Sequence, residues 1–265
     1  MPAWLFMWAL SFAIFAALKW MTWWMAHDRL RATVGRSLAY LLAWPGMDAH
    51  TFLDPRVQPD RPKLKEWLRA TTKTALGIVL LWVIAHRIPA EQSLLRGWIG
   101  LFGLIFLLHF GSFHLVSLFW RTNGIVAAPI MSSPILSKTL TDFWGKRWNL
   151  GFRQLAHEFI FTPLQRHTGA SIAGLLVFVA SGLIHDLVIS VPACGGYGLP
   201  TAYFIIQGLG IVFERSTPAR RIGLQKGLPA RIFILLVTAA PAFWLFHPPF
   251  VHRVIIPFMH VIKAL

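Results

Sequence analysis

The sequence predicts an all-α membrane protein: a polytopic bundle of about six spans with further helices at the membrane surface. Of its 265 residues, 56% are hydrophobic, including 13 Trp and 21 Phe, and the mean hydropathy is +0.59. This composition is too apolar for a soluble domain of this size. The apolar residues also gather in long segments, with basic residues mainly between them. We therefore interpret residues 1–265 as a single membrane-embedded domain.

Six segments are long enough, or nearly so, to cross a hydrocarbon core of about 30 Å. They are residues 3–25, 74–88, 98–120, 171–191, 200–213 and 230–246. The first lacks a basic start and a small-residue cleavage site, so we expect a retained span rather than a signal peptide. Residues 251–265 are expected to form a seventh, partial span or an interfacial helix.

The basic residues predict how the spans are oriented. Of the 25 Lys and Arg residues, 20 lie in the loops after the first, third and fifth spans. The first of these loops holds nine, from Arg29 and Arg31 to Lys73. Because cytoplasmic loops carry an excess of Lys and Arg, we expect these three loops in the cytoplasm and both termini outside. Lys19, within the first span, is expected to snorkel to the surface. A bacterial inner (cytoplasmic) membrane is the expected location.

Two of the long loops are expected to contain interfacial helices. In residues 35–44, Leu38, Leu41 and Leu42 recur at helical spacing, which is typical of a helix lying in the headgroup layer. Residues 150–166 show the same amphipathic pattern, with apolar and polar side chains on opposite stripes.

The net charge of +15 restricts the class of partner. Nucleic-acid binding needs a basic soluble face, whereas these charges lie between apolar segments, so we expect no nucleic-acid partner. Phosphate-bearing partners such as membrane lipid headgroups or coenzyme A fit better. The single Cys194 excludes an internal disulfide framework and a multi-cysteine metal site. We expect no metal and no cofactor.

His185 is the first candidate for chemistry. A rise of about 1.5 Å per residue places it about 22 Å beyond Ala170, past the middle of the bilayer. An ionisable residue at that depth indicates a functional site by default, and the adjacent Asp186 indicates a polar cavity. Consecutive helical residues point about 100° apart, so Asp186 is not expected to orient the His185 ring. The structural alternative is a neutral histidine bonded to a carbonyl or to Ser181.

Asn149 is the second candidate. It ends the basic and aromatic stretch DFWGKRWN, which begins at Asp142. Its amide can donate to a carbonyl oxygen that gains negative charge, and the neighbouring Lys146 and Arg147 suit phosphates. A Trp and Arg cluster at the start of an interfacial helix is also typical of a plain membrane anchor.

Two ordered motifs carry a family resemblance. They are LTDFWGKRWNLGFRQLAHEFIFTPL around Asn149 and VASGLIHDLVISVP around His185, with HFGSFH and AYLLAWPGM as looser matches. Over about residues 35–214 the chain resembles the membrane-bound O-acyltransferase family, in its wax-synthase-like branch. The resemblance implies acyl transfer from acyl-CoA to a hydroxyl group inside a membrane chamber. The family's histidine corresponds to His185 and its asparagine to Asn149. Asp186 stands where relatives often have Glu.

The resemblance and the residue chemistry together predict the site. His185 would act as general base towards a long-chain alcohol, and Asn149 would orient the thioester or the oxyanion. The expected substrate-binding residues are Trp144, Lys146, Arg147, Trp148, Arg153 and Asp186. Acyl-CoA would be a co-substrate. This hypothesis requires the stretch from Asp142 to Asn149 to descend into the bundle, because a segment lying flat on the surface could not reach His185.

Other functions stay open at this point. The motifs do not separate a fatty alcohol from another hydroxyl acceptor, such as a glycan, a sterol or a secondary metabolite. A transporter would use His185 and Asp186 as a proton relay, but the paired halves common in transporters are not visible. A purely structural membrane subunit would leave His185 unexplained.

Overall fold

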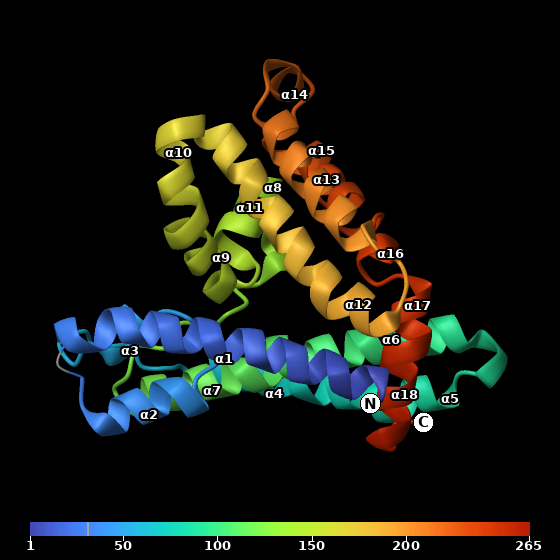
Figure 1. The fold of residues 1–265 in the computed structure, drawn as a ribbon, viewed down its shortest axis with the longest axis horizontal. Coiled ribbons are helices and arrows are strands. Elements are labelled where there is room, and N and C mark those ends of the chain that lie inside the picture. Colours follow the sequence, from blue (N-terminus) through green and yellow to red (C-terminus); the bar gives the residue numbers. More distant parts are fainter. Residues whose placement is uncertain (31) are drawn as a thin grey trace. The chain divides into compact units, whose positions relative to one another are not determined.

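A computed structural model describes residues 1–30 and 32–265, and its regular elements are all helices (Figure 1). The predicted all-α class is thereby confirmed. Arg31, one of the predicted loop cations, lies outside the described residues. The chain forms two compact units. The first comprises Met1–Met7 and Ser132–Pro257, and the second comprises Trp8–Met131 and Phe258–Leu265.

Five helical segments in the described residues are long and apolar enough to cross a membrane. They are Ala3–Leu30, Leu64–Arg87, Ala90–Thr122, Ala170–Ala193 and Gly227–Leu245. The predicted span at residues 200–213 is also helical and lies within Leu199–Glu214. This helix has 16 residues, so it is shorter than each of the other five segments. All six predicted segments are thus helical, and the chain is an integral membrane protein.

The second unit is built mainly from long helices that include π-helical turns. Figure 1 shows α4 beside the continuous helix that runs from α6 through η3 to α7. Its elements are α1 (Ala3–Leu30, which begins in the first unit), α2 (Val34–Ala43), α3 (Ala49–Leu53), α4 (Leu64–Ile78), η1 (Val79–Ile84), α5 (Ala85–Arg87), η2 (Ala90–Gln92), α6 (Ser93–Ile105), η3 (Phe106–Ser112), α7 (Phe113–Thr122) and most of α18 (Ile256–Val261).

Lys19 does not snorkel, contrary to the sequence prediction. Its side chain is 1% exposed, and its ammonium donates a hydrogen bond to the Gly46 carbonyl. The Lys19 Nζ atom also lies 3.3 Å from the centre of the Tyr40 ring. An amine that lies over an aromatic face and donates to a carbonyl has its polar atom satisfied although it is buried. The partners come from α2 and the loop after it, about 20 residues or more along the chain, so α1 alone could not reveal them.

The predicted interfacial helix at residues 35–44 is α2. Tyr40 is fully buried against its neighbours, whereas Leu38 and Leu42 are 52% and 81% exposed. The leucine face is therefore the one that the protein leaves uncovered, as expected for a helix that rests in the lipid headgroup layer.

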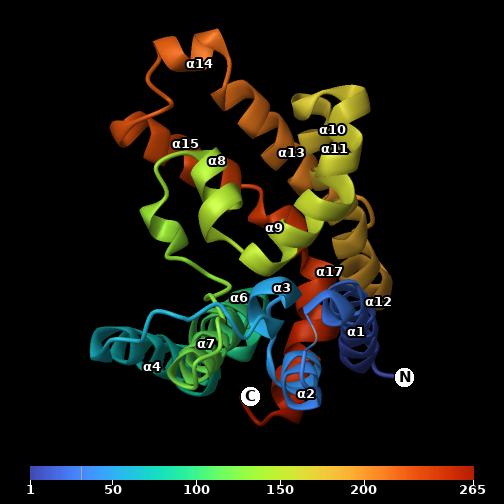
Figure 2. The same cartoon turned by 90° about the vertical axis from the view of Figure 1, so that its left-hand side faces the viewer.

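The first unit is organised around α13. This helix packs against α11 and also contacts α8, α15 and α16. Figures 1 and 2 both show α13 beside α11. The elements of this unit are η4 (Pro134–Leu136), α8 (Leu140–Asp142), η5 (Phe143–Arg147), α9 (Leu150–Ala156), η6 (His157–Phe161), α10 (Thr162–Thr168), α11 (Ala170–His185), η7 (Asp186–Ser190), α12 (Val191–Ala193), α13 (Leu199–Glu214), α14 (Thr217–Arg221), α15 (Gly227–Ala239), α16 (Ala242–Leu245), α17 (Pro248–Phe250) and η8 (Val251–Ile255).

A glycine allows α11 and α13 to pack closely near His185. A Cβ atom on Gly182 would lie 2.6 Å from the Cα atom of Thr201, so only glycine fits this crossing. The contact brings the C-terminal turn of α11, which ends at His185, against the first turns of α13. The long segment predicted at residues 150–166 is likewise helical, as α9, η6 and α10 in succession.

Candidate active site

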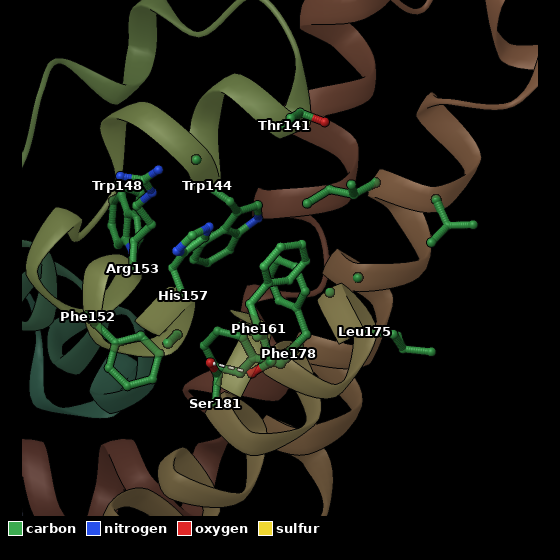
Figure 3. A pocket seen from close by; sticks show the side chains of 18 of the residues that line it. Thr141, Trp144, Trp148, Phe152, Arg153, His157, Phe161, Leu175, Phe178 and Ser181 are labelled. Carbon is green, nitrogen blue, oxygen red and sulfur yellow. Dashed lines mark hydrogen bonds between the residues drawn. The ribbon is translucent and has the colours of Figure 1, made fainter. Parts of the chain in front are cut away.

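A cavity of about 330 Å³ lies within the first unit. Its walls come from η5, α9, η6, α11 and α13, and Figure 3 shows Trp144, His157, Phe161 and Phe178 around one space. His185 and Asn149 both line this cavity. The two predicted catalytic residues, 36 positions apart in the sequence, are thus brought to one chamber.

The backbone of α11 determines which nitrogen of His185 is available. Its Nδ1 atom lies 2.7 Å from the Ser181 carbonyl oxygen, one turn earlier in the helix. A carbonyl can only accept, so Nδ1 carries the proton and donates it to this bond. In neutral His185 the Nε2 atom therefore keeps its lone pair, which is the state that a general base needs. The sequence also allowed a purely structural histidine that is bonded to a carbonyl. That bond is present, and it leaves Nε2 available for catalysis.

Asp186 has a different environment, although it follows His185 directly. Its carboxylate accepts hydrogen bonds from the backbone N–H groups of Gly198 (2.8 Å) and Thr201 (3.0 Å), at the start of α13. The hydroxyls of Thr201 and Ser190 donate to it as well. This is an N-terminal helix cap with a negative charge at the positive end of the helix. Asp186 does not line the cavity, so its position does not support the predicted contact with substrate.

Asn149 has a backbone conformation that favours its residue type. Its φ of 41° and ψ of 62° lie in the left-handed region, which asparagine tolerates better than most residues. It caps α9, because its Oδ1 atom accepts from the Phe152 N–H at 3.3 Å. The turn before α9 places this side chain in the cavity wall.

The stretch from Asp142 to Asn149 contacts α11 and α13 through Trp144. Trp144 Nε1 donates to the side-chain oxygen of Gln207 at 3.2 Å. The ring of Trp144 lies 5.8 Å from that of Phe204, which lies 4.4 Å from that of His185. Aromatic contacts thus connect this stretch to the predicted base.

Glu214 anchors the beginning of the same stretch. Its side chain, in the last turn of α13, is buried, and its carboxylate accepts from the backbone N–H groups of Leu140 and Thr141. The Thr141 hydroxyl donates to it at 2.7 Å. The helical turn that leads into Trp144 is therefore capped by a residue more than 70 positions away.

The basic residues of DFWGKRWN do not line the cavity. Arg147 Nε donates to Asp142 at 2.8 Å, and its Nη1 atom donates to the Ser132 and Ser133 carbonyls. Burial raises the pKa of the Asp142 carboxyl, but the hydrogen bond and charge of Arg147, the Lys138 N–H and the charge of Lys146 together outweigh burial, so this pKa lies below its ordinary value. Lys146 is exposed. The structure therefore brings neither Lys146 nor Arg147 to the chamber.

Two arginine side chains do line the cavity. Arg153, one of the predicted substrate-binding residues, lies one helical turn before His157 (Figure 3). Arg215 follows the last turn of α13 and is exposed. In the sequence Arg215 contributes only to the charge pattern that predicts membrane orientation, because nothing local connects it with the distant motifs. The predicted Trp144 and Trp148 also line the cavity.

Comparison with known proteins relates part of the chain to a known family. Residues 127–206, which include both Asn149 and His185, match the model of the membrane bound O-acyl transferase family. The predicted resemblance to this family is therefore confirmed.

Curated plant proteins are similar to the chain over parts of their length. Probable long-chain-alcohol O-fatty-acyltransferase 2 of Arabidopsis thaliana is 32% identical over 47% of this chain and 39% of the relative. Probable long-chain-alcohol O-fatty-acyltransferase 3 of the same plant is 28% identical over 70% of this chain and 58% of the relative. Acyl-CoA–sterol O-acyltransferase 1 is 27% identical over 46% and 38%. The matched region thus spans about two fifths to three fifths of these relatives.

Proposed function

We propose that this relative of the membrane bound O-acyl transferases moves a fatty acyl group from acyl-CoA to the hydroxyl of a long-chain alcohol. The observation that carries the proposal is the shared chamber of His185 and Asn149, within the region that matches the family model. The names of the long-chain-alcohol O-fatty-acyltransferase relatives support the substrate pair.

In the proposed reaction His185 is the general base. Its Nε2 atom takes the hydroxyl proton as the alcohol oxygen attacks the thioester carbon, and the C–S bond breaks as the ester forms. A positioned base of this kind contributes about 10² to 10⁴ in rate. The protonated ring then supplies a proton to the departing coenzyme A thiolate.

Asn149 and the basic residues have supporting roles in the same proposal. The amide of Asn149 donates to the thioester oxygen as it gains charge, an interaction whose loss costs about 10² to 10³ in kcat. Arg153 and Arg215 line the cavity and are exposed, so they are suited to the phosphates of coenzyme A. Lys146 and Arg147 are less suited, because Arg147 is already paired with Asp142 and neither lines the chamber.

A sterol is the second candidate acceptor, since acyl-CoA–sterol O-acyltransferase 1 matches 46% of the chain, against 47% for probable long-chain-alcohol O-fatty-acyltransferase 2. A glycan or a secondary metabolite has no comparable support. The relatives named above are plant proteins, so the expected bacterial cytoplasmic membrane gains no support.

The test is ester formation by membranes that contain the protein, supplied with labelled acyl-CoA and a panel of alcohols and sterols. We expect a long-chain ester from wild type and a loss of about 10² or more in rate from His185→Ala. His252→Ala is the matched control, because His252 is exposed and does not line the cavity. Equal ester formation by wild type and His185→Ala would remove the proposed base. Ester from sterol alone would select the second acceptor.

A further inference from the structure

Phe204 contacts the His185 ring, and Trp144 and Phe178 extend this contact into a cluster of three aromatic side chains, here called the collar. The ring of Phe204 lies 4.4 Å from the imidazole ring, centre to centre. Trp144 packs on Phe204 at 5.8 Å and meets Phe178 edge to face at 5.6 Å. All four side chains line the same cavity. One side of the proposed base is therefore covered by the Phe204 ring, with the other two aromatic side chains behind it.

A buried amide holds the collar in place. Gln207 is fully buried on α13, one turn beyond Phe204. Its side-chain oxygen accepts from Trp144 Nε1, and its Nε2 atom donates to the Val237 carbonyl at 2.7 Å. The polar atom of Trp144 is thus directed to α13. Phe204 itself is only 5% exposed, so its position is set by packing rather than by solvent.

This collar bears on a chemical problem of the proposed reaction. A base that deprotonates an alcohol can also deprotonate water, and water attack would release the acyl group as a fatty acid. An ordered water needs about two to four polar partners. The aromatic rings on the Phe204 side of His185 offer it no strong hydrogen-bond partner. A long-chain alcohol, in contrast, gains from apolar surroundings.

We propose that Phe204, backed by Trp144, excludes water from His185 and so directs the acyl group to the alcohol. The inference rests on the proposed acyl transfer and adds a specificity-determining residue to it. In the suppressed side reaction, the water oxygen bonds to the thioester carbon while the C–S bond breaks. The proton passes to His185 Nε2 and then to the thiolate, which gives fatty acid and free coenzyme A.

The experiment measures two products from one acyl-CoA in membranes that contain the full chain. Labelled acyl-CoA is supplied with a long-chain alcohol, and both ester and free fatty acid are quantified. We expect Phe204→Ala to raise the ratio of acid to ester about tenfold, because the opened collar admits water. A merely structural role would lower both products together and leave their ratio unchanged.

Phe213→Ala is the matched control, since Phe213 lies on the same helix but packs on Phe233 at 6.0 Å, away from the cavity. Its acid-to-ester ratio should equal that of wild type. The double variant His185→Ala with Phe204→Ala should not form the extra fatty acid that Phe204→Ala forms. This result would show that His185 is also the base in hydrolysis.

The outcomes separate this inference from the proposed function. An unchanged ratio in Phe204→Ala, with normal ester formation by wild type, would overturn the inference and leave acyl transfer intact. Where the alanine variant does not fold, Phe204→Val removes less volume and decides by the same criterion. Failure of wild type to form any ester that depends on His185 would instead remove the proposed function itself.

Discussion

At the scale of single residues, Asn149 combines two properties that substitutions can separate. Its Oδ1 atom caps α9, whereas its amide group is the proposed donor to the thioester oxygen. Asn149→Asp keeps the capping oxygen and tolerates the left-handed backbone, but it has no amide to donate. We expect this variant to keep its thermal unfolding temperature and to lose about 10² to 10³ in kcat for ester formation.

Asn149→Gly controls for the backbone in this comparison. Glycine accepts the left-handed conformation readily, and replacing a capping residue by glycine costs only a few tenths of a kcal/mol. It should therefore resemble Asn149→Asp in activity. Near-normal ester formation by both variants would show that the amide has no part in the reaction.

Asp142 shows how a single ion pair makes stability depend on pH. Its pKa is lower in the folded protein than in the unfolded chain, where a value of about 3.9 applies. The Asp142–Arg147 pair therefore stabilises the fold above about pH 4, and this contribution is lost as the pH falls further, through the folded pKa. We expect wild type to exceed Asp142→Asn by about 1 kcal/mol at pH 7, the size of one such bond.

The measurement is thermal unfolding of the two proteins in detergent between pH 7 and pH 3. The difference between them should stay constant down to about pH 4 and shrink below it. A difference that grows on acidification would contradict the assigned pairing of Asp142 with Arg147.

At the scale of secondary-structure elements, α13 is held by carboxylates at both ends. Asp186, which precedes α13, caps the first turn of this helix. Glu214 lies in the last turn of α13 and caps α8. Between them, Phe204 packs on His185 and Gln207 binds Trp144. One helix thus sets the positions of both halves of the proposed site.

The cap at the start of α13 extends to a buried histidine. His247 Nδ1 accepts from the Phe250 N–H, so its Nε2 atom carries the proton and lies 3.2 Å from the Ser190 hydroxyl oxygen. Ser190 in turn donates to Asp186 at 2.9 Å. His247 and Ser190 are both fully buried, so this chain of bonds ties η7 to the start of α17.

Removing the cap should therefore cost stability. We expect Asp186→Ala to lower the free energy of unfolding by about 2 kcal/mol, the upper range for a helix cap. Asp186→Asn should cost less, because its remaining oxygen still accepts one backbone N–H. Thermal unfolding in detergent measures both. An alanine variant as stable as wild type would show that the cap does not hold α13.

At the scale of the whole molecule, the predicted orientation has a convenient probe in Cys194. It is the single cysteine of the chain and is exposed, between the fourth and fifth predicted spans. The charge pattern places it on the side opposite the three basic loops. We expect a membrane-impermeant thiol reagent to label Cys194 only from the non-cytoplasmic side of sealed membranes.

The control moves the thiol to a basic loop. Arg56 has an exposed side chain, so Arg56→Cys combined with Cys194→Ser should be labelled only after the membrane is opened. Labelling of both proteins from the same side would overturn the predicted orientation.

The sequence by itself determined the helical class, the apolar segments and the positions of the two motifs. Hydropathy and charge bias are local properties, so they can be recognised without knowing which helices meet. His185 stood out for the same reason, because a titratable residue in an apolar run is unusual wherever that run packs.

Only the tertiary structure decided which polar groups gather around the site. Gln207 and Glu214 act on residues 63 or more positions earlier, and Arg215 reaches the cavity from the end of a different helix. It also directed Asp186 to a helix cap and Arg147 to an ion pair, away from the chamber. These assignments depend on which helix faces meet, and that is settled by packing across the whole unit rather than by the pattern along one segment.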